Sequence, residues 1–163
     1  MTEQVAGATV RREVTVRAPV ERAFSVFTEG IATWWPHEET HNVGPTPADA
    51  VMEPFEGGRC YAKAYDGTET DWGRVMTWDP PNRVVFAWLL SPQWEYEPDP
   101  AKTTEVEVRF EDDGSGGTRV ELEHRGFERY AAGGDAMRDQ VDKPGGWTAL
   151  MELYAGAFEK DAG

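Results

Sequence analysis

The sequence contains a single cysteine, Cys60, so the chain cannot close an internal disulfide. Basic residues are also scarce, because 16 Lys and Arg face 30 Asp and Glu and leave a net charge of −14. Such a charge repels nucleic acid and anionic membrane surfaces, and no run of Lys or Arg supplies a local basic stripe. These shortages exclude a disulfide-rich domain, and we expect no nucleic-acid partner.

Long hydrophobic runs are missing as well. No apolar stretch approaches the length of a membrane span, and residues 1–14 lack the apolar segment of a signal peptide. Because a lone cysteine fits a reducing compartment, we expect a cytoplasmic protein without membrane insertion. Cys60 itself we interpret as a small, buried strand residue.

Common catalytic signatures are absent too: there is no Walker loop, no dinucleotide-type glycine motif and no Gly-x-Ser-x-Gly segment. The segment His-Glu-Glu-Thr-His at 37–41 matches the H-E-x-x-H spacing of zinc proteases. However, Pro36 precedes it, Gly44 and Pro45 follow it, and no apolar helix surrounds it. We therefore interpret it as a polar loop and predict neither a metal nor another cofactor.

What the chain does contain suits one packed domain. Its 163 residues are 39% hydrophobic and 12% aromatic, enough for a sizeable core. We predict a single domain over 1–163, in which residues 1–8 form a loose tail.

The apolar pattern predicts a first strand over 10–17 and then a short helix that Pro19 opens and Gly30 ends. A second short turn follows over 31–35. From residue 49 the pattern has period two and predicts six more strands, at 49–55, 58–65, 69–78, 83–91, 103–112 and 117–126. Turn residues separate these strands, so we expect an antiparallel meander and not a parallel sheet.

The last element is predicted to be a helix, preceded by a short one near 135–141. One apolar stripe recurs at i, i+3, i+4, i+7 and i+11, formed by Trp147, Leu150, Met151, Tyr154 and Phe158. The predicted fold class is therefore α+β. A curved antiparallel sheet of about seven strands wraps around a long C-terminal helix, and two short helices follow the first strand.

Charge restricts how the last two strands pair. A register with Arg109 opposite Arg119 would place like charges opposite one another along the hairpin, which is unfavourable. Registers with Arg109 opposite Glu121 or opposite Glu123 both give mainly opposite-charge pairs and stay open. In the first of these, His124 faces inward opposite Val106.

His124 interrupts the apolar face of its own strand, where Val120 and Leu122 precede it. Three interpretations are a buried histidine with its hydrogen bonds satisfied, a polar group lining a ligand cavity, and a catalytic base. No nucleophile lies nearby in the sequence, which disfavours the base. We favour the cavity-lining role over the structural one.

Aromatic residues are the most informative group, with seven tryptophans in the chain. For any single tryptophan, the simpler interpretation is that it fills the hydrophobic core. Together, wide rings on a curved sheet beneath one helix predict an apolar cavity, the usual form of a ligand site. We predict that it is lined by Trp35, Tyr61, Trp72, Phe86, Trp88, Val106, Val108, Leu122, His124, Trp147, Met151 and Tyr154. No residue is assigned a catalytic role.

Several segments in order carry a resemblance to a known family. They are PVERAFSVFTEGIATWWP, MEPFEGGRCY, DGTETDWGRVMTWDPPNRVVFAW, TEVEVRFEDDGSGGTRVELEHRGFE and GGWTALMELY. This series, over about residues 10 to 158, resembles the SRPBCC (START-like) superfamily. Within it, the chain is similar to the branch of the activator of heat-shock-protein-90 ATPase. The resemblance implies a helix-grip fold, a curved sheet gripping the C-terminal helix around a hydrophobic cavity.

The resemblance leaves several functions open, because relatives include lipid carriers, hormone receptors, polyketide aromatase/cyclases and the chaperone activator. The first hypothesis is that the chain binds a small hydrophobic or aromatic molecule, with His124 as a polar anchor. An aromatase/cyclase-like enzyme and a chaperone ATPase co-activator are the alternatives. A homodimer or a chaperone is accordingly a possible protein partner.

Overall fold

The computed structural model describes residues 9–35, 47–93, 95–130 and 132–162 of the 163-residue chain. Seven strands in this part form one antiparallel sheet in the order β1-β7-β6-β5-β4-β3-β2. The strands are β1 (Val10–Val16), β2 (Pro47–Met52), β3 (Arg59–Ala64), β4 (Glu69–Asp79), β5 (Arg83–Trp88), β6 (Thr104–Asp112) and β7 (Thr118–Arg125). The predicted meander is confirmed, and β1 extends it by pairing with β7.

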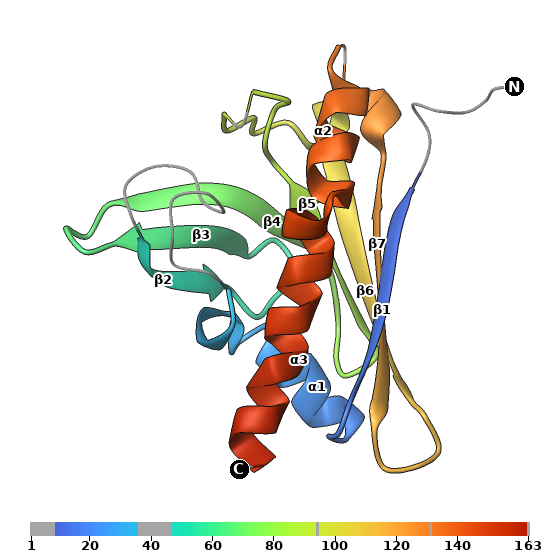
Figure 1. The fold of residues 1–163 in the computed structure, drawn as a ribbon. Coiled ribbons are helices and arrows are strands. Elements are labelled where there is room, and N and C mark those ends of the chain that lie inside the picture. The colour runs from blue at the N-terminus through green and yellow to red at the C-terminus, as the bar shows by residue number, and fades with distance from the viewer. Residues whose placement is uncertain (1–8, 36–46, 94, 131, 163) are drawn as a thin grey trace, which may run out of the picture.

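Helical segments precede, connect and follow the strands of this sheet. They are α1 (Val20–Phe27), η1 (Ile31–Thr33), η3 (Pro100–Lys102), η4 (Phe127–Arg129), α2 (Gly134–Asp142), η5 (Pro144–Thr148) and α3 (Ala149–Ala162). Figure 1 shows α3 crossing the concave side of the bent sheet, with α1 close to its lower half. The α+β helix-grip architecture is therefore confirmed. In the described part of the chain, no helix has the length and apolar character needed to cross a membrane.

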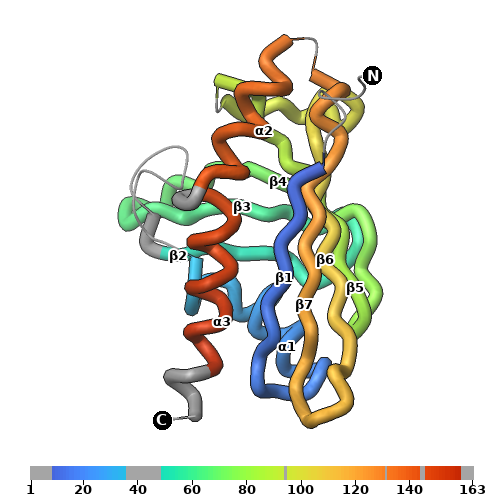
Figure 2. The backbone as a smooth tube through the Cα atoms, turned by 45° about the vertical axis from the view of Figure 1, so that its right-hand side comes forward, coloured from blue at the N-terminus to red at the C-terminus, as the bar shows by residue number. Residues whose placement is uncertain are grey.

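The sheet bends strongly, so β2, β3 and β4 turn away from the upright strands β1, β7 and β6 (Figures 1 and 2). Register shifts accompany the bend, among them those at the Cys60–Tyr61 step of β3 and at the Val75–Thr77 step of β4. Between them lies Gly73, where a Cβ would stand 2.7 Å from a backbone oxygen of β5. Irregular pairing of this kind increases strand twist, which explains the half-barrel shape.

The core fills the concave side. Alternate residues of β5, β6 and β7 are buried there, and α3 turns its apolar stripe toward them. The stripe predicted from the sequence is confirmed by the burial of Trp147, Leu150, Met151, Tyr154 and Phe158. Cys60 is also fully buried, as predicted.

The pairing of β6 with β7 selects one of the two registers that charge left open. Arg109 lies opposite Glu121, and Val106 lies opposite His124. The register with Arg109 opposite Arg119 is excluded, as predicted. The second open register, with Arg109 opposite Glu123, is wrong.

Several boundaries differ from the predictions for local reasons. The strand predicted over 83–91 ends at Trp88, because Leu90 instead forms an isolated bridge with Tyr96. The helix that Pro19 opens begins one residue later, and Pro19 lies at its N-cap. Trp147 belongs to the π-helical segment η5 and not to α3, which begins at Ala149, and the non-helical backbone of Gly146 precedes it within η5. The predicted tail at 1–8 lies outside the described residues.

Candidate functional site

Four tryptophans from four different segments meet on the concave side. Trp35 follows η1, Trp72 belongs to β4, Trp88 ends β5, and Trp147 lies in η5. All four are at most 6% exposed. These rings, which are far apart in the chain, come together under the C-terminal helix, and their role in lining a ligand cavity stays a prediction.

The indoles of Trp35 and Trp72 are stacked, with ring centroids 5.4 Å apart and planes at 10°. Trp88 meets Trp72 edge-on at 6.0 Å, and Trp147 lies 5.7 Å from Trp88 and 6.4 Å from Trp35. We call these four residues the indole cluster. It combines one parallel stack with several tilted contacts, the two geometries that aromatic rings prefer.

Small side chains line the sheet beyond the stack. On β2 and β3 the residues buried on the concave side are mostly small, Ala50, Cys60, Ala62 and Ala64, and Met52 is the larger exception. The adjacent strands β4 and β5 carry larger buried side chains, Trp72 and Phe86 among them. The inner face therefore changes from bulky to small side chains where the sheet turns toward β2.

The other predicted lining residues on the concave side are also buried. Those placed on the concave side and at most 2% exposed are Phe86, Val106, Val108, Leu122, Met151 and Tyr154. The hydroxyl of Tyr154 donates to the carbonyl oxygen of Ala23 at 2.7 Å. These residues make up the packed core between the sheet and α3.

Tyr61 does not belong to this group. It lies on the convex side of β3, where the guanidinium of Arg59 stands 4.1 Å from its ring centroid. Cys60 and Ala62 take the inward positions on either side of it. The prediction of Tyr61 as a lining residue is wrong, because alternation along β3 places its side chain outward.

Both ring nitrogens of His124 are occupied by protein groups. The indole N–H of Trp147 donates to Nδ1 at 3.0 Å, and Nε2 lies 2.7 Å from the hydroxyl of Thr104. His124 is 0% exposed, and burial lowers the pKa of its imidazole to about 3. It is a neutral core histidine with satisfied hydrogen bonds, so the favoured role as a free polar group for a ligand is corrected.

The hydrogen bonds continue beyond Thr104. A hydrogen bond joins its hydroxyl to the phenol of Tyr130, and that phenol donates to the carbonyl oxygen of Leu90 at 2.6 Å. Burial raises the pKa of Tyr130 to about 12. The sequence did not identify Thr104 or Tyr130, because both look like ordinary strand and loop residues.

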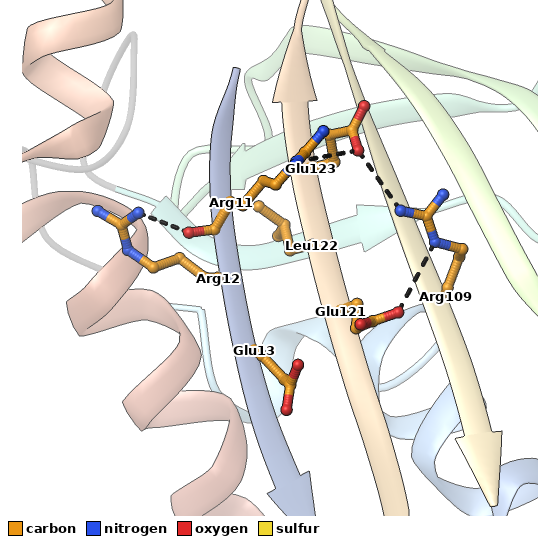
Figure 3. A pocket seen from close by; sticks show the side chains of 7 residues that line it. All are labelled: Arg11, Arg12, Glu13, Arg109, Glu121, Leu122 and Glu123. Carbon is orange, nitrogen blue, oxygen red and sulfur yellow. Dashed lines mark hydrogen bonds and ion pairs between the residues drawn. The ribbon is translucent and has the colours of Figure 1, made fainter. Parts of the chain in front are cut away.

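The convex side of the sheet is polar and carries rows of arginine and glutamate. A hollow of about 230 Å³ lies there over β1, β7 and β6. Figure 3 shows Arg109 between Glu121 and Glu123, with Arg11 beside Glu123. Because its charges already pair with one another, this hollow does not present a single-signed site for a charged ligand.

A metal site is not found in the described ranges, where no group of three or more His, Cys, Asp or Glu converges. The His-Glu-Glu-Thr-His segment at 37–41 lies outside those ranges. Cys60 is fully buried, and burial raises the pKa of its thiol, which makes it a poor nucleophile.

Comparison with known proteins identifies the family. The family described as Activator of Hsp90 ATPase homolog 1-like protein matches residues 17–153. The chain belongs to this family. A search among curated proteins finds no match.

Two solved structures share substantial sequence with this family member. One is the anthrahydroquino-gamma-pyrone synthase Txn09 complexed with SUM, which is 38% identical over 94% of this chain and 99% of that one, with a TM-score of 0.64. The other is CalC, a self-sacrificing resistance protein from Micromonospora echinospora, which is 29% identical over 96% and 97% of the two chains, with a TM-score of 0.66.

A third solved structure supports the fold alone. The Aha1 dimer from Colwellia psychrerythraea is 17% identical over 96% of this chain and 99% of that one, with a TM-score of 0.63. Members of one fold thus include a protein named as a synthase, one named as a resistance protein and the Aha1 dimer.

Proposed function

We propose that the chain binds a planar, uncharged aromatic molecule of the polyketide type between the bent sheet and α3. The observation that carries the proposal is the indole cluster, which adjoins the small side chains of β2 and β3. A flat ring system fits this arrangement because it can extend the Trp35–Trp72 stack over Ala50 and Ala62.

Preference for an uncharged ligand follows from the chemistry of the concave side. In the described ranges the buried polar side chains are Thr28, Thr103, Thr104, Glu107, Thr118 and His124. Glu107 is the acid among them, and it pairs with arginines on the convex side. A charged ligand on the concave side would therefore lose its hydration without gaining an ionic partner from these residues.

The relatives support the class of ligand. Txn09 is named as the synthase of an anthrahydroquino-gamma-pyrone, a name that describes fused aromatic rings. CalC is named as a resistance protein and thus has a different activity. Because the two activities differ, the proposal concerns binding, the property that both kinds of protein need.

An aromatase/cyclase-like reaction is the second candidate, favoured by the 38% identity to a synthase. For such an enzyme the cavity would hold a reactive chain in a productive shape. His124 is a poor candidate for its base, because the imidazole is buried and both nitrogens are engaged. The chaperone-activator function suggested by the family name remains a prediction about a protein partner.

A titration with flavone tests the binding proposal, since flavone is flat, contains a gamma-pyrone ring and does not ionise. We expect saturable quenching of tryptophan fluorescence, corrected for absorption by the probe, with micromolar affinity. A flavone carboxylate is the matched control and should bind at least about tenfold more weakly, because its charge must be desolvated. Failure of flavone to saturate, or equal binding of the two probes, would contradict the proposal.

A further inference from the structure

Trp147 is the member of the indole cluster that directly follows a break in the helical backbone. It lies in η5, next to Gly146, whose φ of −89° and ψ of −125° are not helical. This break separates Trp147 from the helical turns that precede it, so those turns do not direct its side chain. The indole is instead anchored through its N–H, which donates to Nδ1 of His124 at 3.0 Å.

His124 supplies that anchor through a chain of hydrogen bonds with one direction. An indole N–H can only donate, so Nδ1 of His124 must accept and the proton of the neutral ring must lie on Nε2. Nε2 then donates to Thr104, the hydroxyl of Thr104 donates to the phenol of Tyr130, and that phenol donates to the carbonyl oxygen of Leu90. Because a carbonyl can only accept, both ends of the chain enforce the same tautomer.

We infer that His124 is a positioning residue for the proposed ligand site, which it serves by holding the indole of Trp147 against Trp35 and Trp88. The inference rests on the proposed function for its binding readout. His124 acts through Trp147 and does not touch the ligand itself. If Nδ1 could no longer accept, the indole N–H would be left buried without a partner, and the ring would turn away from the cluster.

The surroundings of His124 keep this arrangement constant near neutral pH. Its described neighbours are uncharged on every element: Trp88 on β5, Thr104 and Val106 on β6, Phe127 on η4, Trp147 on η5 and Val10 on β1. Tyr130 is the nearest titratable group in the chain of hydrogen bonds, and its pKa is about 12. Flavone binding should therefore not change between about pH 5 and pH 8, whereas a free histidine would titrate in that range.

Two substitutions test the roles of the two ring nitrogens of His124 separately. In His124→Asn the side-chain oxygen takes the place of Nδ1 and can still accept from Trp147, whereas in His124→Gln the amide nitrogen takes the place of Nε2 and serves Thr104. We expect His124→Asn to keep flavone affinity within about threefold of the unmodified chain, and His124→Gln to lose about tenfold or more. Equal affinities of the two variants, or the reverse order, would overturn the inference.

A second set of variants, made in the Trp147→Phe protein, controls for loss of the fold. Trp147→Phe keeps an aromatic ring but removes the N–H, so in that background His124→Asn and His124→Gln should bind flavone equally well. A difference as large as in the unmodified background would contradict positioning through Trp147. Circular dichroism and thermal unfolding establish which variants are folded. The two His124 variants in the Trp147→Phe background are compared at temperatures where their free energies of unfolding are equal.

A ligand-free spectrum separates failure of this inference from failure of the proposed function. The indole N–H signal of Trp147 in ¹⁵N–¹H spectra should stay shifted and protected from hydrogen exchange in His124→Asn, and lose both properties in His124→Gln. If flavone does not bind at all but the spectra behave in this way, the proposed function fails and the positioning stands. Identical Trp147 signals in both variants would overturn the positioning whatever flavone does.

Discussion

Glu107 and Glu123 lie directly opposite each other across β6 and β7, and arginines on either side hold the two carboxylates together. The guanidinium of Arg125 reaches Glu107 at 2.7 Å and Glu123 at 3.2 Å. Arg109 reaches the same two residues at 3.3 and 3.4 Å. A pair that should repel is thus converted into part of an ionic lattice on the convex side of the sheet.

Glu107 should be the most costly member of this lattice to change. Its side chain is 7% exposed, and although burial favours the neutral acid, hydrogen bonds from Arg125 and Arg83 outweigh burial and lower the pKa of Glu107. We expect Glu107→Gln to reduce the free energy of unfolding by about 2 kcal/mol, because the buried carboxylate loses its charge-assisted hydrogen bonds with Arg83 and Arg125.

Glu111→Gln is the matched control, since it removes the same charge from the same strand. Glu111 is 54% exposed and pairs with Arg119, so its loss should cost no more than about 0.5 kcal/mol. Urea unfolding of both variants measures the difference. Equal costs would show that the lattice contributes no more than an ordinary surface ion pair.

The fold could largely be predicted from the sequence because its main features depend on local patterns. Alternation along β6 and β7 and the stripe of α3 reflect which face each residue must bury. The register required tertiary information, since Arg109 could pair with Glu121 or Glu123. The sequence also did not show that arginines would bridge the like-charge pair Glu107 and Glu123. The end of β5 at Trp88 likewise depends on the bridge between Leu90 and Tyr96, which are outside any regular pattern.

Acid should reveal the buried state of His124. Its pKa falls from an ordinary value of 6.5 to about 3 on folding, so the unfolded chain takes up the proton first. This contribution to stability is complete above pH 6.5 and is lost as the pH falls toward 3. Two pH units below 6.5, the loss should reach about 2–3 kcal/mol.

His124→Asn isolates this effect, because asparagine does not titrate and the variant keeps every carboxylate of the chain. The stability difference between the unmodified chain and His124→Asn should shrink by about 2–3 kcal/mol between pH 7 and pH 4.5. Denaturant unfolding at the two pH values measures it. A difference that does not change with pH would show that the imidazole is not buried in its neutral form.

Tyr130 should be important for the stability of the hydrogen-bond chain. Removing its hydroxyl in Tyr130→Phe leaves the carbonyl of Leu90 and the hydroxyl of Thr104 without this partner inside the protein, at a cost of about 1–2 kcal/mol. Tyr65→Phe is the control, because Tyr65 is 82% exposed, and its stability should change by less than about 0.5 kcal/mol. Thermal unfolding that ranks the two variants equally would contradict a structural role for the phenol.

The candidate site was less predictable than the fold. Aromatic composition was enough to suggest the indole cluster, but Tyr61 was assigned to the wrong face, although Arg59 and Lys63 share its parity on β3 and indicate an outward side chain. The partners of His124 come from β6 and η5, at sequence separations of 20 and 23 residues, and no local pattern links them. The sequence therefore identified His124 as unusual without giving its role.

The central claim is that a planar aromatic molecule occupies the end of the half-barrel where β2 and β3 carry small side chains. Equilibrium dialysis of flavone against Ala62→Phe and Lys63→Phe tests it most directly, because these neighbours on β3 face opposite sides of the sheet. Thermal unfolding first confirms that both variants fold. Filling the concave side in Ala62→Phe should weaken flavone binding by about tenfold or more, whereas Lys63→Phe should bind within about twofold of the unmodified chain. Equal binding by the two folded variants would contradict the account.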